Sequence, residues 1–239
     1  MKNYIKPEFF YHKAANIAAC LILGSGMFLS YGLLAGLFMA PIDYQQKAAV
    51  RIMYVHVPCA LLSLSVYTII GITSLIYLIW KIKIADVIAK VSAPFGAAVT
   101  FIALISGSLW GKPMWGTWWV WDARLTSELI LLFLYLGYIG LRSAIHDQKI
   151  AANMAAILAV VGLIDIPIIH FSVNWWNTLH QGASITSFAK PAIDVAMLYP
   201  LMSTIIGLYM VCGALILLNA RTEVLWRERG SKWVRAHVL

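Results

Sequence analysis

Long stretches of uncharged apolar residues alternate with short polar segments along this chain. Four of these stretches contain no Lys, Arg, Asp or Glu, and they lie at 14–40, 52–80, 91–111 and 195–220. A helix that rises ~1.5 Å per residue through ~30 Å of hydrocarbon needs about 20 such residues. Two weaker stretches lie at 125–141 and 150–170. Glu128 interrupts the first and Asp165 the second, so the pattern predicts six membrane spans in all.

The whole chain, 1–239, is therefore expected to form one all-α, polytopic integral membrane domain. We expect six transmembrane helices and a tryptophan-rich loop at 111–124; the spans are predicted at about 17–40, 52–80, 92–110, 125–142, 150–170 and 195–219. Hydrophobic residues make up 62% of the chain and charged residues 12%, whereas soluble domains have roughly 45–50% and about 25%. This composition excludes a disordered chain, a disulfide-stapled secreted module and a soluble DNA-binding protein.

The basic residues predict the orientation of the chain. With six spans, thirteen of the Lys and Arg residues fall on the side that holds both termini, and five fall on the other side. The positive-inside rule then places both termini in the cytoplasm and the tryptophan-rich loop on the outer face. The net charge of +8 is thus a topology signal and gives no support for a nucleic-acid partner.

Two further features narrow the class. The first apolar run, of 27 residues at 14–40, exceeds the 7–15 residues of a signal-peptide core, so we interpret it as an uncleaved first span. The three cysteines lie within predicted spans and form no C-x-x-C pair, which favours a packing role over thiol chemistry.

The tryptophans gather on the outer side of the predicted bundle. Of ten, seven fall there: Trp110, Trp115, Trp118, Trp119, Trp121, Trp175 and Trp176. An aromatic belt would enrich tryptophan at both interfaces without clustering four of them within 115–121. Two interpretations stay open at this point, a re-entrant hairpin that seals the bundle and a platform of indole faces that holds a planar ligand.

The tryptophan-rich stretch at 110–128 reads WGKPMWGTWWVWDARLTSE. Gly111, Pro113 and Gly116 argue against a continuous helix through its first half. The part from Asp122 onward is expected to begin the fourth span, with Glu128 in its first turn near the positive helix N-terminus.

Two histidines are candidate ligands on the same side. His56 lies near the outer start of the second span, and His180 lies in the third outer loop. Two neutral imidazoles from opposite sides suit a haem iron, although a single interfacial histidine is more often only a hydrogen-bonded polar residue. His170 is a reserve ligand. Zinc is not supported, because no third and fourth ligand occurs at a familiar spacing.

Charged residues around these histidines allow alternative roles. Arg51 and Arg124 could each pair with a haem propionate or serve as interfacial anchors that reach toward lipid headgroups. Asp122 could pair with Arg124 or Lys112, or accept an indole N–H. Asp165 has no evident partner, and no path of ionisable residues across the spans is expected from the sequence.

The stretch WGKPMWGTWWVWDARLTSE resembles the WWD signature of haem-handling proteins in cytochrome c maturation. The segments RIMYVHVP and HFSVNWWNTLHQG resemble the matching histidine regions of the heme exporter protein C family, CcmC. The similarity covers about 43–182, and six spans fit this family better than its larger relatives, which have many more.

The resemblance implies a function and a set of partners. Such proteins hold haem b transiently at the periplasmic face of the bacterial inner membrane and present it to the periplasmic haem chaperone CcmE for c-type cytochrome biogenesis. The implied membrane partners are a one-span subunit, CcmD, and the ABC transporter subunits CcmA and CcmB. No enzymatic activity is implied. The matching residues here are His56 and His180 as axial ligands and Trp115, Trp118, Trp119, Trp121 and Asp122 as the haem and chaperone platform.

Two other functions compete with haem presentation. A transporter that moves haem through its helices would need a route across the bilayer, but the recognisable features crowd one face. A membrane redox protein of the cytochrome b kind would place paired histidines within facing helices, whereas His180 is predicted to lie in a loop.

Overall fold

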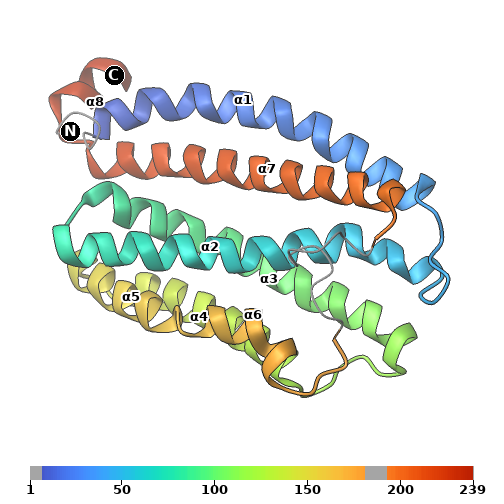
Figure 1. Ribbon diagram of the computed structural model, residues 1–239. Helices are drawn as coiled ribbons and strands as arrows, with labels where there is room; N and C mark the ends of the chain where they lie inside the picture. The colour runs from blue at the N-terminus through green and yellow to red at the C-terminus, as the bar shows by residue number, and fades with distance from the viewer. Residues whose placement is uncertain (1–6, 181–192, 239) are drawn as a thin grey trace.

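The computed structural model describes residues 7–180 and 193–238, and almost all of them are helical (Figure 1). No β-strand occurs in these two ranges. Six helical segments are long and apolar enough to cross a membrane, which confirms the predicted all-α fold with six spans. The helices are α1 (Pro7–Leu34), continued by a π-helical turn (Ala35–Met39), α2 (Met53–Trp80), preceded by a 3-10 turn (Ala48–Ile52), α3 (Lys83–Trp115), α4 (Ala123–Ala144), α5 (Gln148–Gly162), α6 (Asp165–Trp175), α7 (Val195–Arg227) and α8 (Lys232–Val238).

Several helices extend well beyond the predicted apolar spans. α1 begins at Pro7, ten residues before the predicted start, and α3 and α7 each contain 33 residues. At 1.5 Å per residue such a helix is about 50 Å long and outreaches a hydrocarbon layer of about 30 Å. Hydropathy marks only the part of a helix that is apolar, so the charged turns at both ends escape it.

The fifth span is broken rather than continuous. α5 ends at Gly162 and α6 begins at Asp165, with the break two residues before Pro167. Proline has no N–H to donate and its ring crowds the preceding turn, so a helix restarts with proline in its first turn more readily than it runs through it. The break places α6 at one end of the bundle, beside α4.

The helices that form the six spans lie in three groups. α1 runs along α7, α4 lies with α5 and α6, and α2 and α3 lie between these two groups (Figure 1). The two chain ends lie together at what we call the terminal end, with the connections 81–82 and 145–147. Residues 40–52, 116–122 and 176–180 lie at the opposite end, called the loop end.

Small residues allow α1 and α7 to pack closely. A Cβ added at Gly32 would lie 2.7 Å from the backbone nitrogen of Thr204, and one at Gly207 would lie 2.9 Å from that of Leu29. Backbones that approach this closely gain van der Waals contact, the main source of helix association in a membrane. Both positions therefore require glycine.

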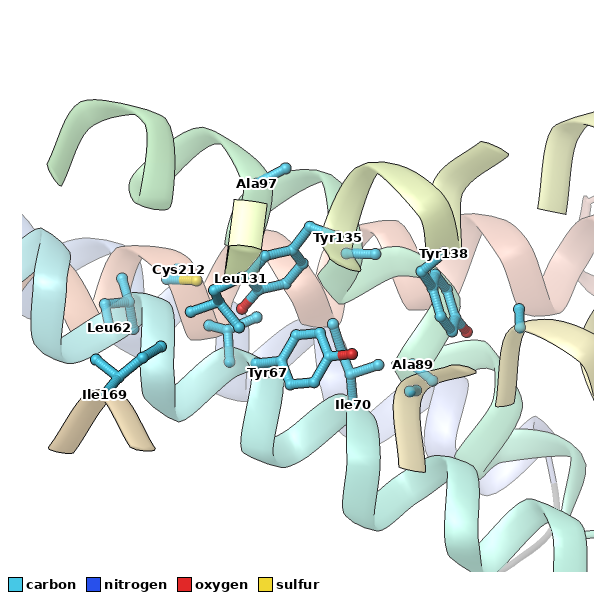
Figure 2. Close-up of a cluster of buried hydrophobic side chains, with 14 residues drawn as sticks. Leu62, Tyr67, Ile70, Ala89, Ala97, Leu131, Tyr135, Tyr138, Ile169 and Cys212 are labelled. Carbon is cyan, nitrogen blue, oxygen red and sulfur yellow. The ribbon is translucent and has the colours of Figure 1, made fainter. Parts of the chain in front are cut away.

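The largest buried hydrophobic cluster is built around tyrosines and alanines (Figure 2). Tyr67 and Tyr135 meet edge to face with ring centroids 5.0 Å apart, and the Tyr135 hydroxyl donates to the Ser63 carbonyl oxygen at 2.7 Å. Cys212 packs into the same cluster. The cysteines thus lie in helices, and Cys59 and Cys212 are buried.

A charged cluster ties α3, α4 and α7 together near the terminal end. The Asp86 carboxylate accepts from Arg142 at 2.6 Å and from Arg227 at 2.7 Å, while Glu223 accepts from Arg227 and Lys90, each at 2.7 Å. The Asp86 and Arg142 side chains are each only 5% exposed. Each of the two carboxylates therefore meets two cations, and among the described residues the buried Nε of Arg142 is left without a hydrogen-bond partner.

Candidate functional site

His56 lies in the second turn of the second span, where α3 fixes its ring. Its Nδ1 is 3.0 Å from the Ala103 carbonyl oxygen and 3.2 Å from the Ser106 hydroxyl, both on α3. Gly107 leaves room for the ring, since a Cβ there would lie 3.0 Å from Cε1 of His56. A carbonyl can only accept, so we assign the hydrogen to Nδ1, and the Nε2 lone pair is left for a metal.

His180 follows α6 at the loop end and faces His56. The two ring centroids are 6.3 Å apart, and the Trp115 ring lies 5.6 Å from His180. The His180 Nδ1 atom is buried, and the described residues offer it no hydrogen-bond partner. Desolvation, with a smaller effect of the Arg124 charge, lowers the pKa of His180 to about 4. The ring is therefore neutral at neutral pH, the form that binds metals.

The separation of the two rings matches that of two imidazoles sharing one metal ion. Metal–imidazole bonds of about 2.0–2.1 Å place two opposed nitrogens roughly 4 Å apart, and the ring centres then lie about 6 Å apart. The observed 6.3 Å agrees with this value. The donor set thus fits a metal held from two sides.

The space between the histidines is a small cavity of about 30 Å³. About 10–15 Å³ of such space holds one water molecule, so this cavity admits only a few. The lining comes from α2, α3, α4, the tryptophan-rich loop and the His180 segment, and its residues include His56, Gly107, Trp115, Trp119, Arg124, Glu128 and His180. A planar macrocycle is many times larger than water, so it enters this site only when the surrounding side chains move apart.

The tryptophan-rich stretch starts as helix, contrary to the expectation that its first half is irregular. α3 continues through Gly111 and Pro113 to Trp115 and ends at Gly116, whose φ is 77°. Pro113 falls in the last turn, where it removes only one backbone hydrogen bond. Gly111 is needed for packing, because a Cβ there would lie 3.0 Å from the Trp115 ring.

The four tryptophans of the predicted platform do not form one surface. Trp115 and Trp119 line the cavity, whereas Trp118 and Trp121 are 54% and 75% exposed. Trp119, which lines the cavity, meets the exposed Trp121 edge to face, with ring centroids 5.4 Å apart. The buried Nε1 of Trp119 finds no acceptor in the part of the chain that the structure describes.

Asp122 does not make any of the three contacts considered from the sequence. It is the N-cap of α4, and its Oδ1 accepts from the Leu125 N–H at 2.8 Å. Its Oδ2 accepts from the hydroxyl of Thr178, and not from Arg124, Lys112 or an indole. Thr178 lies 56 residues away in sequence, and no motif marked it as a partner.

The two candidate arginines occupy different positions. Arg124 lines the cavity and donates to the Ile169 carbonyl oxygen at 2.8 Å; within 7–180 and 193–238 it makes no ion pair. Arg51 lies in the 3-10 turn before α2 and does not line the cavity, although its buried Nε has no partner among the described residues. The structure thus brings Arg124, but not Arg51, to the two histidines.

Glu128 lies in the second turn of α4, whereas the sequence suggested the first. It lines the cavity and accepts from the Ser63 hydroxyl at 2.7 Å. Asp165, for which the sequence showed no evident partner, is buried at the start of α6, and its Oδ2 has no partner within the described ranges.

The remaining histidines stay apart from the site. His170 is exposed on α6, where its ring meets that of Phe171 with centroids 4.7 Å apart, so the structure does not place it as a third ligand. His12 and His146 lie toward the terminal end. Sequence reasoning missed Glu128, Gly107 and Thr178, whose roles depend on contacts between different helices.

These features define a class of protein, a six-span membrane protein with a two-histidine site beneath a tryptophan-rich loop. The chain belongs to the heme exporter protein C family, since the family model described as "Heme exporter protein C" matches residues 1–235. That family is one of transport components and not a class of enzymes.

Several curated proteins resemble the chain along nearly its whole length. It is 48% identical over 233 residues to heme exporter protein C of Haemophilus influenzae, which covers 98% of this chain and 95% of that protein. It is 46% identical over 219 residues to heme exporter protein C of Escherichia coli K12, covering 92% and 88%. The protein of that name from Paracoccus denitrificans is 40% identical over 234 residues, covering 98% and 97%.

Proposed function

We propose that this chain holds haem b transiently at the loop end, between His56 and His180, and presents it to the periplasmic chaperone CcmE for c-type cytochrome biogenesis. The observation that carries the proposal is the facing pair of imidazoles, 6.3 Å apart, with neither Nε2 engaged by a described residue. The relatives' name, heme exporter protein C, identifies the cargo of this family as haem.

The two ligands differ in how firmly the chain holds them. His56 is locked by α3 through Ala103, whereas His180 sits on a short segment after α6. Haem held by one fixed and one displaceable ligand stays bound yet leaves when the second ligand withdraws. This asymmetry suits a protein that presents its cargo, and displacement of the His180 segment also opens the 30 Å³ cavity.

Other residues of the site have roles consistent with this function. Among the described residues, the Arg124 guanidinium has no carboxylate partner and is suited to a haem propionate. Arg51, whose Nε has no partner in the same ranges, is a second candidate. Trp115 and Trp119 offer indole faces to the macrocycle. Trp118 and Trp121 are exposed and are suited to contact the chaperone.

The orientation and the wider assembly complete the proposal. The excess of Lys and Arg at the terminal end favours a cytoplasmic location for both termini in the bacterial inner membrane, with the loop end in the periplasm. CcmD and the ABC transporter subunits CcmA and CcmB are the proposed membrane partners. The long apolar helices provide surface for both partners and lipid.

Passage of haem through the chain itself is the second candidate function. Buried Glu128 and Asp165 favour it, because ionisable groups inside a membrane often line a route. Against it, the cavity between the histidines lies at the loop end, whereas the Asp86 carboxylate near the terminal end is occupied by two arginines. We therefore favour presentation.

Haem retention in single-histidine variants tests the proposal. His56→Ala and His180→Ala should each co-purify with at least tenfold less haem than wild type, because each removes one iron ligand. His146→Ala is the matched control and should retain wild-type haem, since His146 lies near the terminal end. Equal haem in all three variants would exclude the assigned ligands.

A further inference from the structure

The position of His180 depends on one polar contact between its segment and the rest of the bundle. Among the described residues, the segment 177–180 makes a single side-chain hydrogen bond to another element, from the Thr178 hydroxyl to Oδ2 of Asp122. The His180 ring adds none, because its Nδ1 has no described partner. His56 differs from His180, because its ring is hydrogen-bonded directly to α3.

Thr178 connects this contact to the backbone of His180. Its hydroxyl donates to Asp122 and at the same time accepts from the His180 N–H, at 2.9 Å. A threonine hydroxyl that binds the N–H two residues later closes a local turn and fixes the direction in which the chain proceeds. One side chain thus sets both where the segment is attached and how His180 leaves it.

Asp122 provides a rigid attachment point. One of its oxygens caps α4 through the Leu125 N–H at 2.8 Å, which fixes the carboxylate relative to the helix. α4 also reaches α6 through Arg124, which donates to the Ile169 carbonyl oxygen at 2.8 Å. The carboxylate is therefore fixed on α4, and α4 is itself tied to α6, the helix that the His180 segment follows.

We propose that Thr178 is a positioning residue that holds His180 opposite His56, and that Asp122 acts on iron ligation through Thr178 as well as capping α4. The inference rests on the proposed function and extends it to a residue outside the WWD signature. Loss of the Asp122–Thr178 hydrogen bond frees His180 while His56 stays in place. The tryptophan-rich loop, which carries Asp122 at its end, is thereby coupled to the displaceable ligand.

The test compares Thr178→Val, which keeps the shape but removes the hydroxyl, with Thr178→Ser, which keeps the hydroxyl. In purified protein loaded with haem, Thr178→Val should show a roughly tenfold lower ratio of six-coordinate low-spin to five-coordinate haem, the effect of losing one hydrogen bond to a charged acceptor. Added imidazole should restore the low-spin spectrum of Thr178→Val, because it replaces a displaced ligand. Thr178→Ser should match wild type.

A haem-free measurement separates this inference from the proposed function. Backbone amides at 177–180 should exchange hydrogen at least fivefold faster in haem-free Thr178→Val than in wild type, and at the wild-type rate in Thr178→Ser. Thr73→Val is the matched control, since Thr73 is half-buried on α2 and donates only to carbonyl oxygens of its own helix. It should change neither spectrum nor exchange.

A double variant tests the path from Asp122. In the protein that keeps Thr178, Asp122→Ala should lower the low-spin fraction of the bound haem. In the Thr178→Val background it should cause no further loss. Additive losses, or a Thr178→Val protein with wild-type spectrum and exchange, would overturn the inference. If wild type binds no haem while exchange still responds to Thr178→Val, the proposed function fails and the positioning role of Thr178 stands.

Discussion

The two ends of the bundle treat their buried charged groups in opposite ways. At the terminal end, the Asp86 carboxylate meets the guanidinium groups of Arg142 and Arg227 at 2.6 and 2.7 Å. At the loop end, Arg124 has no carboxylate partner among the described residues, and His180 leaves its Nδ1 unpaired. Buried polar groups are normally satisfied, so the ion pairs at the terminal end are suited to stabilise the fold, and the unpaired groups at the loop end support the proposed ligand site.

The first prediction removes the Asp86 ion pairs near the terminal end. Asp86→Ala should lower the free energy of unfolding by about 3–5 kcal/mol, because it leaves the buried Arg142 charge without its nearest carboxylate. Thermal unfolding in detergent measures the effect. Lys83→Ala, which removes an exposed ion pair to Glu228, should cost less than about 1 kcal/mol. Equal effects of the two variants would show that the Asp86 cluster does not stabilise the fold.

The second prediction sharpens the contrast within the loop end. Imidazole added to His180→Ala should restore low-spin haem, because His180 lies on a short segment after α6 and its ring has no hydrogen bond to the described helices. It should restore His56→Ala several-fold less, since that position is enclosed by Ala103, Ser106 and Gly107 on α3. Visible spectra during an imidazole titration measure both. Equal rescue would contradict the assignment of one fixed and one displaceable ligand.

The third prediction concerns acid. The folded pKa of His180 is about 4 against an ordinary value of 6.5, so the unfolded or displaced segment binds the proton more readily. The contribution of His180 to local order is full above pH 6.5, falls as pH drops toward 4, and falls no further below that. Hydrogen-exchange protection at 177–180 in haem-free protein, taken relative to the intrinsic exchange rate at each pH, should fall over this window. In His180→Gln this loss of protection should vanish, and its persistence would assign the pH dependence to another group.

The smallest expected effect comes from the space around His56. Gly107→Ala places a Cβ 3.0 Å from Cε1 of His56, so the ring must shift by a few tenths of an ångström. We expect a two- to fivefold weaker haem affinity with little change in stability, measured by haem titration. Gly26→Ala is the matched control, because a Cβ there meets nothing within 4 Å. Weaker binding in the control as well would remove the steric explanation.

The number of spans followed from the sequence, whereas the helix ends did not. Apolar runs mark the membrane core, and the four charge-free runs and the two interrupted ones correspond to the six spans. The turns at the ends of α1, α3 and α7 contain charged residues that extend past the hydrocarbon, so hydropathy could not include them. Pro113 was expected to prevent a continuous helix, but it lies in the last turn of α3, a position that the sequence alone does not reveal.

The candidate site was only partly predictable for a different reason. His56, His180 and the tryptophans stand out by type and by motif, so one sequence was enough to select them. Thr178 and Glu128 are ordinary residues whose roles arise from partners 56 and 65 positions away, Asp122 and Ser63. Such contacts are set by how the helices pack, which the local pattern does not encode.

The most direct test of the central claim is the visible and electron paramagnetic resonance spectrum of the detergent-purified protein after haem addition. Wild type is compared with a His56→Ala, His180→Ala double variant, and a His146→Ala, His170→Ala variant serves as the matched control. The proposed site predicts low-spin, six-coordinate haem with two imidazole ligands in wild type and control, lost in the double variant. Haem that fails to bind wild type, or that keeps the same spectrum in the double variant, would contradict the account.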